Sequence, residues 1–407
     1  MTEAGSEIGV RQMAGFKDFY QAANATRVIA GRDLLGSTGF EMTKEGAHRV
    51  WVVTDEIIRG TGLVDRVIAG VEDGGLEVAG VFDDVPQDSS TDVCDRCAEE
   101  AKAAGADSWL AVGGGSVMDT AKIADALFTH GGTAAESEGF FLMPRSDDGM
   151  GAPLPIAPLV CIPTTCGTGS EVSMGAVVKD NERKVKLEIA DFPLFPRVAI
   201  LDPESTKTLP PHIAASTGMD AMTHAIEGYV SVDWNPHQDG RSLVALRLIR
   251  DNLERAVADP SDEEARGNML VAASLAITLG LGSTHSMSHP CGAHYGVPHG
   301  VANAINMPHV IRFNAAGGAD IADRYRDLNE IFDLDTGGSP ADVGEALASH
   351  VTEMIERMGL PTRLSQVGVP EEGIPVLVEG AMGDGLTLMN PREPTEEDYA
   401  ELYRSAL

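Results

Sequence analysis

A metal-binding histidine cluster is the first chemical feature of the sequence, because five of its eleven histidines lie within residues 285–309. On one continuous helix, His285 and His289 would share a face, since they are four residues apart. His299 would lie roughly 21 Å further along the axis. Three residues that interrupt helices stand before it: Gly292, Gly296 and Pro298. The chain can therefore reverse there and bring His299 beside the first pair. A surface or core histidine cluster without a metal is the alternative.

A carboxylate and a further imidazole occur about sixty residues earlier, at Asp220 and His224. Their spacing places both side chains on one face of a predicted helix, where they can chelate one ion. Taken alone, such a pair is more often a surface pair. Combined with His285 and His299, it makes one oxygen and three nitrogens, which suits Fe(II), Zn(II) or Mn(II) with positions left for a substrate. Spacing alone does not separate His289 from these ligands.

Two glycine-rich turns suggest a nucleotide cofactor. The first is Gly113-Gly114-Gly115-Ser116, which follows an apolar run and precedes an amphipathic helix. Its glycines would let the backbone approach a diphosphate at the helix N-terminus. The dinucleotide fingerprint G-x-G-x-x-G is incomplete, because Met118 replaces its last glycine and Asp119 follows. A tight turn between strand and helix is therefore the alternative interpretation.

The second turn, residues 163–170, also follows an apolar run and is rich in glycine and hydroxyl groups, among them Thr164 and Thr165. Two such turns on one sheet favour a nucleotide cofactor over two ordinary turns. Asp55, at the end of the first predicted strand, could bind a ribose diol and repel a 2′-phosphate, which would favour NAD over NADP. Its ordinary alternative is to cap a helix.

Predicted secondary structure divides the chain near residue 204. Before that point apolar strands alternate with helices, which predicts a mostly parallel sheet covered on both faces. The expected strands are Val50–Val53, Val78–Phe82, Trp109–Val112, Leu159–Ile162, Gly175–Val178, Lys184–Ile189 and Val198–Leu201. The expected helices between them run from Thr54-Asp55 to Ala69, from Thr91, and from Val117 to Phe128.

From Pro211 onward the apolar periodicity is almost wholly helical. The expected helices are Ile213–Val230, Gly240–Val257, Glu263–Leu279, the histidine stretch, Ile321–Phe332, Ala341–Met358, Gly373–Ala381 and Thr395–Ala406. The predicted fold is thus an α/β dinucleotide-binding domain, residues 1–204, followed by an all-α metal-binding domain, residues 205–407.

Composition restricts the partners. The formal net charge is -32 over 407 residues, which disfavours nucleic acid and anionic membranes as partners. We expect a cytoplasmic protein, because the first thirty residues lack a secretion signal and five cysteines are too few and too scattered for a disulfide framework. The Cys94-x-x-Cys97 motif is interpreted as two ordinary thiols. The acidic, lysine-poor composition leads to the hypothesis of a protein that works in high salt.

Four linked motifs together resemble the iron-containing (group III) alcohol dehydrogenase family, close to its lactaldehyde reductase branch. They are Gly113-Gly114-Gly115-Ser116 with Asp119, the Pro163–Glu171 loop, Gly218-x-Asp220-Ala221-x-Thr223-His224-Ala225, and His289-Pro290 through Pro298-His299-Gly300. The resemblance extends from about Thr26 to the end of the chain. It implies an N-terminal dinucleotide domain, a helical C-terminal domain and a cleft between them.

The resemblance also implies roles for individual residues. The family's metal ligands fall on Asp220, His224, His285 and His299, whereas His289 matches a histidine near the substrate. Cofactor contacts fall on Asp55, Gly113, Gly114, Gly115, Ser116, Asp119, Thr164, Thr165 and Lys186. The chain departs from the family at Pro86-Gln87-Asp88, where Pro-Asn-Pro is common, and at Cys166, which replaces a small apolar residue.

The predicted reaction is hydride transfer between a small primary alcohol or diol and NAD(P), with NAD preferred. An alcohol oxygen bound to Fe(II) would have a lowered pKa, so alkoxide would be accessible near neutral pH, and His289 would relay the proton. Small alcohols or aldehydes are the expected partners, and the protein is expected to be a homo-oligomer. The alternatives are a hydroxyacid-oxoacid transhydrogenase that retains its NAD and, in a different class, a non-enzymatic metal-binding protein.

Overall fold

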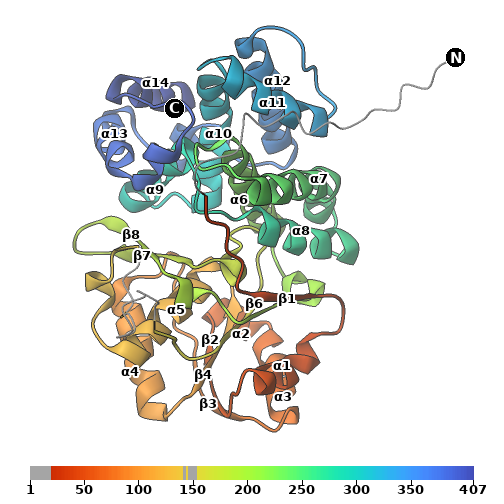
Figure 1. The fold of residues 1–407 in the computed structure, drawn as a ribbon, viewed down its shortest axis with the longest axis vertical. Coiled ribbons are helices and arrows are strands. Elements are labelled where there is room, and N and C mark those ends of the chain that lie inside the picture. The colour runs from red at the N-terminus through yellow and green to blue at the C-terminus, as the bar shows by residue number, and fades with distance from the viewer. Residues whose placement is uncertain (1–19, 141–143, 145–153) are drawn as a thin grey trace, which may run out of the picture.

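A six-stranded parallel sheet forms the centre of the N-terminal half in the computed structural model, which describes residues 20–140, 144 and 154–407 (Figure 1). Its strands are β1 (Arg27–Ala30), β2 (Arg49–Val53), β3 (Glu77–Phe82), β4 (Ser108–Gly113), β6 (Leu159–Pro163) and β9 (Val198–Leu201). Across the sheet they lie in the order β1-β9-β6-β4-β2-β3. All residues of β4, β6 and β9 are buried, as expected for central strands covered on both faces.

Helices cover the two faces of this sheet. They are α1 (Thr38–Lys44), α2 (Glu56–Gly60), α3 (Leu63–Asp73), α4 (Thr91–Ala104) and α5 (Gly115–His130). Val50 and Val52 of β2 pack in one apolar cluster with residues of α1 and α3. Trp51 and Val53 of the same strand pack in a second cluster, with α4 and α5. This alternation follows from the two-residue period of a strand.

A second, three-stranded sheet lies beside α5 and consists of β5 (Gly139–Phe140), β7 (Gly175–Asp180) and β8 (Val185–Ala190). β7 and β8 are antiparallel neighbours joined by a short turn, a connection that parallel strands do not allow. Two of the strands expected from the sequence therefore lie outside the main sheet. Their inner residues, such as Val178 and Leu187, pack into the same apolar cluster as α5.

The C-terminal half is helical, as predicted, and is the upper part of the molecule in Figure 1. Its helices are α6 (Pro211–Val230), α7 (Pro236–Ala258), α8 (Glu263–Ala276), α9 (Ser283–Tyr295), α10 (His299–Ala315), α11 (Ala319–Ile331), α12 (Pro340–Arg357), α13 (Ile374–Gly383) and α14 (Glu396–Ala406). Its largest apolar core contains residues of α6, α7, α8, α10, α11 and α12. A smaller core contains residues of α9, α10, α13 and α14.

Short 3-10 helices connect several of these elements. They span Leu35–Ser37, Ala134–Glu136, Ser170–Val172, Phe192–Leu194, Pro203–Thr206, Leu364–Val367, Glu371–Gly373 and Gly385–Met389.

The histidine stretch reverses where the sequence predicts. α9 ends at Tyr295, and Gly296 follows it in the left-handed conformation, with φ of 66°. Pro298 then precedes α10, whose first residue is His299. Glycine adopts this conformation without steric cost, and proline favours a helix start over its continuation. Gly292, by contrast, lies inside α9 and does not interrupt it.

Several predicted boundaries differ from the structure. The single helix expected to reach Ala69 is divided into α2 and α3 at Gly62, whose φ is 78°. The helix expected to end at Leu279 ends at Ala276. β1 and α1 were not predicted. β1 is only four residues long and mostly exposed, and its pairing with β9 defines it.

Other expectations concern cysteines and membranes. Cys94 and Cys97 are free, buried thiols, as predicted, and burial raises the pKa of the Cys97 thiol to about 12. Within the described part of the chain, no helix is both long enough and apolar enough to cross a membrane. Residues 1–19, which contain most of the segment examined for a secretion signal, lie outside the described residues.

Candidate metal and cofactor site

Three helices carry the predicted metal ligands. α6 bears Asp220 and His224, α9 bears His285, and α10 begins with His299. Gly300 sits against the backbone of α6, because a Cβ atom at this position would collide with the carbonyl oxygen of Ser216. The small residue therefore permits the close approach that brings the start of α10 to α6.

The structure brings the four predicted ligands together. The Nε2 atoms of His224, His285 and His299 lie 4.0, 3.9 and 3.5 Å from Oδ1 of Asp220. Ligand atoms around one tetrahedral ion with bonds of about 2.1 Å are separated by roughly 3.4 Å. The observed separations are close to that value, so the donor set fits a single divalent ion after small side-chain movements.

Burial keeps two of these imidazoles neutral. It lowers the pKa of His224 to about 4, although Asp220 opposes the change. Burial also lowers the pKa of His299 well below its ordinary value, and the positive charge of Lys186 adds to the effect. Metal ions bind the neutral form of imidazole. At neutral pH these side chains are therefore already in the form that a metal requires.

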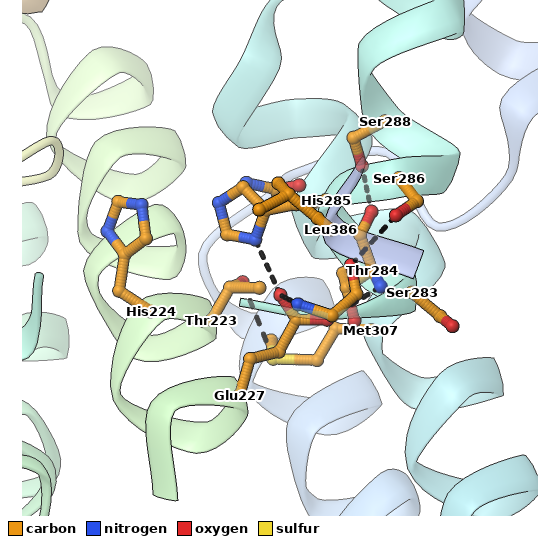
Figure 2. Close-up of polar contacts among 12 residues, drawn as sticks. Thr223, His224, Glu227, Ser283, Thr284, His285, Ser286, Ser288, Met307 and Leu386 are labelled. Carbon is orange, nitrogen blue, oxygen red and sulfur yellow. Dashed lines mark hydrogen bonds and ion pairs between the residues drawn. The ribbon is translucent and has the colours of Figure 1, made fainter. Parts of the chain in front are cut away.

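A buried carboxylate behind His285 was not identified from the sequence. Glu227 lies 2.6 Å from Nδ1 of His285 and also accepts a hydrogen bond from the backbone N–H of Thr284 at 2.6 Å (Figure 2). Burial would raise the pKa of Glu227, but the hydrogen bonds from His285 and Thr284 outweigh it and lower the pKa. The contact fixes the proton on Nδ1, so Nε2 of His285, which faces Asp220, is the unprotonated nitrogen that can bind a metal. The sequence did contain one indication of this role, because Glu227 lies one helical turn after His224 and so shares its face of α6.

Asn303, one turn after His299 on α10, was also not identified. Its Nδ2 atom donates a hydrogen bond to Asp220 Oδ1 at 2.8 Å and lies 3.3 and 3.1 Å from Nε2 of His285 and His299. Its Oδ1 atom is buried and has no hydrogen-bond partner among the described residues. A neutral amide among these donors cannot neutralise the Asp220 carboxylate, whereas a divalent cation can. The residues present thus fit a metal.

His289 belongs to a neighbouring group of side chains. Its Nδ1 atom lies 2.7 Å from Oδ2 of Asp384 and 3.5 Å from Oε1 of Glu188. Its ring stacks on that of His299, with centroids 5.4 Å apart. Burial lowers the pKa of His289, but the charge and hydrogen bond of Asp384, together with Glu188, raise it overall. Neither Asp384 nor Glu188 was identified from the sequence, because both lie far from His289 along the chain.

The glycine-rich turns lie at the carboxyl edge of the main sheet. β3 lies on one side of β2 and β4 on the other, so the chain order reverses between β2 and β4. In open α/β sheets, ligands bind outside the strand ends at such a point. Asp55 follows β2 there, the first turn (Gly113, Gly114, Gly115 and Ser116) lies at the end of β4, and Thr164 follows the neighbouring β6.

The two turns pack against each other. A Cβ atom at Gly115 would lie 2.7 Å from Cγ2 of Thr168, and one at Gly114 would lie 3.2 Å from Cγ2 of Thr165. The first turn leads directly into α5, which begins at Gly115. The backbone N–H groups and dipole at a helix N-terminus attract anions. The turns therefore form an arrangement that suits a diphosphate, with Thr165 beside it.

Two of the predicted cofactor residues, Asp119 and Asp55, accept hydrogen bonds from other residues of the protein. Asp119 accepts hydrogen bonds from Oγ of Ser170 at 2.6 Å and from the backbone N–H of Val177 at 2.9 Å, so it ties the second turn to β7. Asp55 caps α2 by accepting a hydrogen bond from the backbone N–H of Ile58 at 2.8 Å. Helix capping is the alternative role that the sequence suggested for Asp55.

Lys186 lies between the turns and the histidine-rich helix. Its Nζ atom is 3.1 Å from Oδ1 of Asp88, and the backbone N–H of Asp88 donates to Oγ of Ser116 at 3.1 Å. Its Nζ and Cε atoms also lie 3.5 Å from the position that a Cβ atom would take at Gly292 of α9. Asp88, in the segment that departs from the family pattern, thus connects Lys186 to the first glycine turn.

Comparison with protein families gives two matches that together cover most of the chain. Residues 25–203 match the model described as iron-containing alcohol dehydrogenase. Residues 214–407 match the model for the C-terminal part of the Fe-containing alcohol dehydrogenase family.

Curated relatives cover nearly the whole chain. It is 34% identical to the NAD-dependent methanol dehydrogenase of Bacillus methanolicus, over 93% of this chain and 97% of that protein. It is 37% identical to the 4-hydroxybutyrate dehydrogenase of Cupriavidus necator, over 90% of this chain and 94% of that protein. It is 34% identical to the lactaldehyde reductase of Escherichia coli K12, over 92% of this chain and 96% of that protein.

The fold is also similar to solved structures. The crystal structure of a 1,3-propanediol oxidoreductase superposes with a TM-score of 0.89 at 32% sequence identity, covering 96% of this chain and 100% of that one.

Proposed function

The chain belongs to the iron-containing alcohol dehydrogenase family, and from that membership we propose that it interconverts small primary alcohols or diols and their aldehydes with NAD. As a member of this family it is an enzyme, a metal-dependent alcohol dehydrogenase, so a role in metal storage or sensing does not apply. The observation that carries the proposal is the cluster of Asp220 with the imidazoles of His224, His285 and His299, beside His289. NAD is supported by the glycine turns and by one relative whose name states it, the methanol dehydrogenase of Bacillus methanolicus.

In this proposal Asp220, His224, His285 and His299 hold one divalent ion, Fe(II) by family, with Zn(II) and Mn(II) as alternatives. Such an ion lowers the pKa of an alcohol hydroxyl and polarises a carbonyl. Glu227 orients the His285 ring by binding its Nδ1 atom. The carboxylate thereby keeps one ligand in the required tautomer throughout turnover.

His289 is proposed to move the proton. Asp384 holds its Nδ1 atom at 2.7 Å, which fixes the ring and leaves the other nitrogen for the substrate. The raised pKa of His289 keeps its charged form accessible near neutral pH, so the ring can accept a proton during alcohol oxidation and return it during aldehyde reduction.

The cofactor residues are proposed to bind NAD along the carboxyl edge of the sheet. Gly113, Gly114, Gly115 and Ser116 would place its diphosphate at the start of α5, with Thr164 and Thr165 beside it. Asp55 would face the ribose diol and disfavour NADP through charge repulsion. Lys186 would lie between the cofactor and the histidines, while Asp119 would support the second turn.

The first prediction tests this function. Purified protein, stripped of metal and then given Fe(II), Zn(II) or Mn(II), is assayed with short diols, primary alcohols and 2-hydroxy acids in the presence of NAD or NADP. We expect metal-dependent NADH formation with primary alcohols or diols, and a preference for NAD. The measurement is the change in nicotinamide absorbance.

Two results would contradict the proposal. Absence of NADH formation with every alcohol and metal would refute it. Turnover that requires a second carbonyl acceptor, with no reduction of free NAD, would instead indicate a transhydrogenase that retains its cofactor.

A second prediction concerns salt. The chain has 62 acidic and 30 basic residues, so its folded form is destabilised by repulsion that salt screens. Raising KCl from 0.1 to 1 M shortens the screening length from about 10 Å to about 3 Å. We expect Tm to rise by roughly 5 °C or more, which corresponds to ~2 kcal/mol for a domain of this size. Thermal unfolding across a KCl series measures it.

The shape of that series distinguishes screening from salting-out. Screening acts mostly at low concentration, whereas salting-out continues to increase linearly. A falling or constant Tm would contradict adaptation to high salt.

We propose a cytoplasmic location, which the free, buried cysteines support. A homo-oligomer remains part of the proposal, and sedimentation would test it.

A further inference from the structure

We propose that Glu188 selects substrates by charge: it favours alcohols and aldehydes whose far end is neutral or cationic, and disfavours those that end in a carboxylate. The inference rests on the proposed function and narrows its substrate class. It concerns a side chain from the N-terminal half that reaches the histidine-rich helix of the C-terminal half.

β8 directs Glu188 toward α9. Its neighbours in the strand, Leu187 and Ile189, are buried in the apolar cluster beneath the second sheet. Side chains alternate along a strand, so Lys186 and Glu188 project from the opposite face. Lys186 reaches the backbone of α9 at Gly292, and Oε1 of Glu188 lies 3.5 Å from Nδ1 of His289. The two residues thus line the same side of α9.

Glu188 is one imidazole ring away from the proposed metal ligands. The His289 ring, which Glu188 contacts, stacks on His299 at 5.4 Å and faces His285 edge-on at 6.1 Å. The Glu188 side chain retains 28% exposure, so solvent and small molecules reach it. The far end of a small substrate whose reacting oxygen bound the proposed metal would have this carboxylate within reach, on the side of His289.

The charges around Glu188 leave its negative charge available. Asp384 takes the closer contact with His289, at 2.7 Å, while Glu188 stands at 3.5 Å. Lys186, the cation on the same strand face, is paired with Asp88 at 3.1 Å. Within the described residues, His289 is the only ion-pair partner of the Glu188 carboxylate. A hydroxyl or ammonium group of a substrate can bind to it.

The same surroundings disfavour a further negative charge. Burial raises the pKa of Glu188, and the negative charge of Asp384 raises it further against the effect of His289. A substrate carboxylate would be a third negative charge beside those of Glu188 and Asp384. Like charges opposed across a partly buried interface are strongly unfavourable. We therefore expect discrimination of roughly tenfold to a hundredfold in kcat/KM.

The test compares three substrates with the same reacting end and chain length: 1,4-butanediol, 4-hydroxybutyrate and 4-amino-1-butanol. The variant is Glu188→Gln, which keeps the size and the ability to bind a hydroxyl. In the wild type, kcat/KM should be lowest for 4-hydroxybutyrate. In Glu188→Gln its value relative to the diol should rise by roughly tenfold to a hundredfold, and that of the amino alcohol should fall.

Glu182→Gln is the matched control. Glu182 is exposed in the turn that joins β7 to β8, so the substitution removes the same charge from the same hairpin. Its substrate ratios should equal those of the wild type. Unchanged ratios in Glu188→Gln, or an equal change in Glu182→Gln, would overturn the inference.

A binding measurement keeps the inference testable without turnover. At matched ionic strength and without NAD, 4-amino-1-butanol should raise the Tm of the metal-loaded wild type more than 4-hydroxybutyrate does, and Glu188→Gln should remove the difference. Equal shifts with both ions in the wild type would overturn the inference. Inactivity toward all three alcohols, with the binding difference present, would count against the proposed function alone. If Glu188→Gln does not fold, Glu188→Val serves in its place.

Discussion

The Asp220→Asn variant is expected not to retain a divalent metal, and its kcat/KM is expected to fall by roughly 10³-fold or more. Asp220 is the one carboxylate in the donor set, and its Oδ1 atom lies within 4.0 Å of Nε2 of all three imidazoles. Asparagine has the same shape but carries no charge, so the ion would face only neutral ligands in a buried site. The metal contributes several kcal/mol to transition-state stabilisation, and each 1.36 kcal/mol is tenfold in rate.

The measurement is metal content per chain after purification, together with kcat/KM and the rise in Tm on adding metal. Glu227→Gln is the graded control, because Glu227 acts on the metal only through Nδ1 of His285. It should weaken metal affinity by about 10- to 100-fold and leave activity recoverable at high metal concentration. An Asp220→Asn protein with full metal content and activity would disprove the assignment of Asp220.

His289→Ala is expected to keep its metal and to lose about 10²- to 10³-fold in kcat, the usual range for a general acid-base group. His289 contacts Asp384 and Glu188 through Nδ1, and it belongs to a different cluster from Asp220, His224 and His285. Its removal should therefore leave the donor atoms in place and remove the group that moves the proton. Metal content and steady-state kinetics measure the two effects separately.

Asp384→Asn is the matched variant for His289. Asp384 raises the pKa of His289 by charge and by hydrogen bond. Without that charge the pKa of His289 falls, so the neutral ring persists to lower pH and the acid limb of kcat/KM for alcohol oxidation should move to lower pH. An unmoved acid limb would argue against His289 as the group that accepts the proton. A His289→Ala protein purified without metal would show instead that His289 is a ligand.

The local features of the metal site could be predicted from the sequence. The i, i+4 spacing of Asp220 and His224 places both on one face of α6, and helical geometry alone determines this. Likewise, Gly296 and Pro298 end one helix and start the next, because their backbone preferences are local. The central strands were also predictable, because strands that are buried on both faces consist of continuous apolar residues.

The groups around these ligands could not be predicted in this way. Glu188 and Asp384 lie about a hundred residues to either side of His289, on β8 and directly after α13, and no periodicity relates them to it. Asp88 likewise meets Lys186 across 98 positions. Such contacts depend on how the two halves pack, which is decided by many side chains at once.

The histidine stretch shows this division. Its residue types and spacing determined that imidazoles would project from two helices joined by a reversal. Spacing alone did not separate His285 and His299 from His289, and the tertiary structure places the first two near Asp220 and the third beside Asp384. The physical reason is that a helix fixes directions within itself over a few residues, whereas distances between helices are set by packing, as at Gly300 against Ser216.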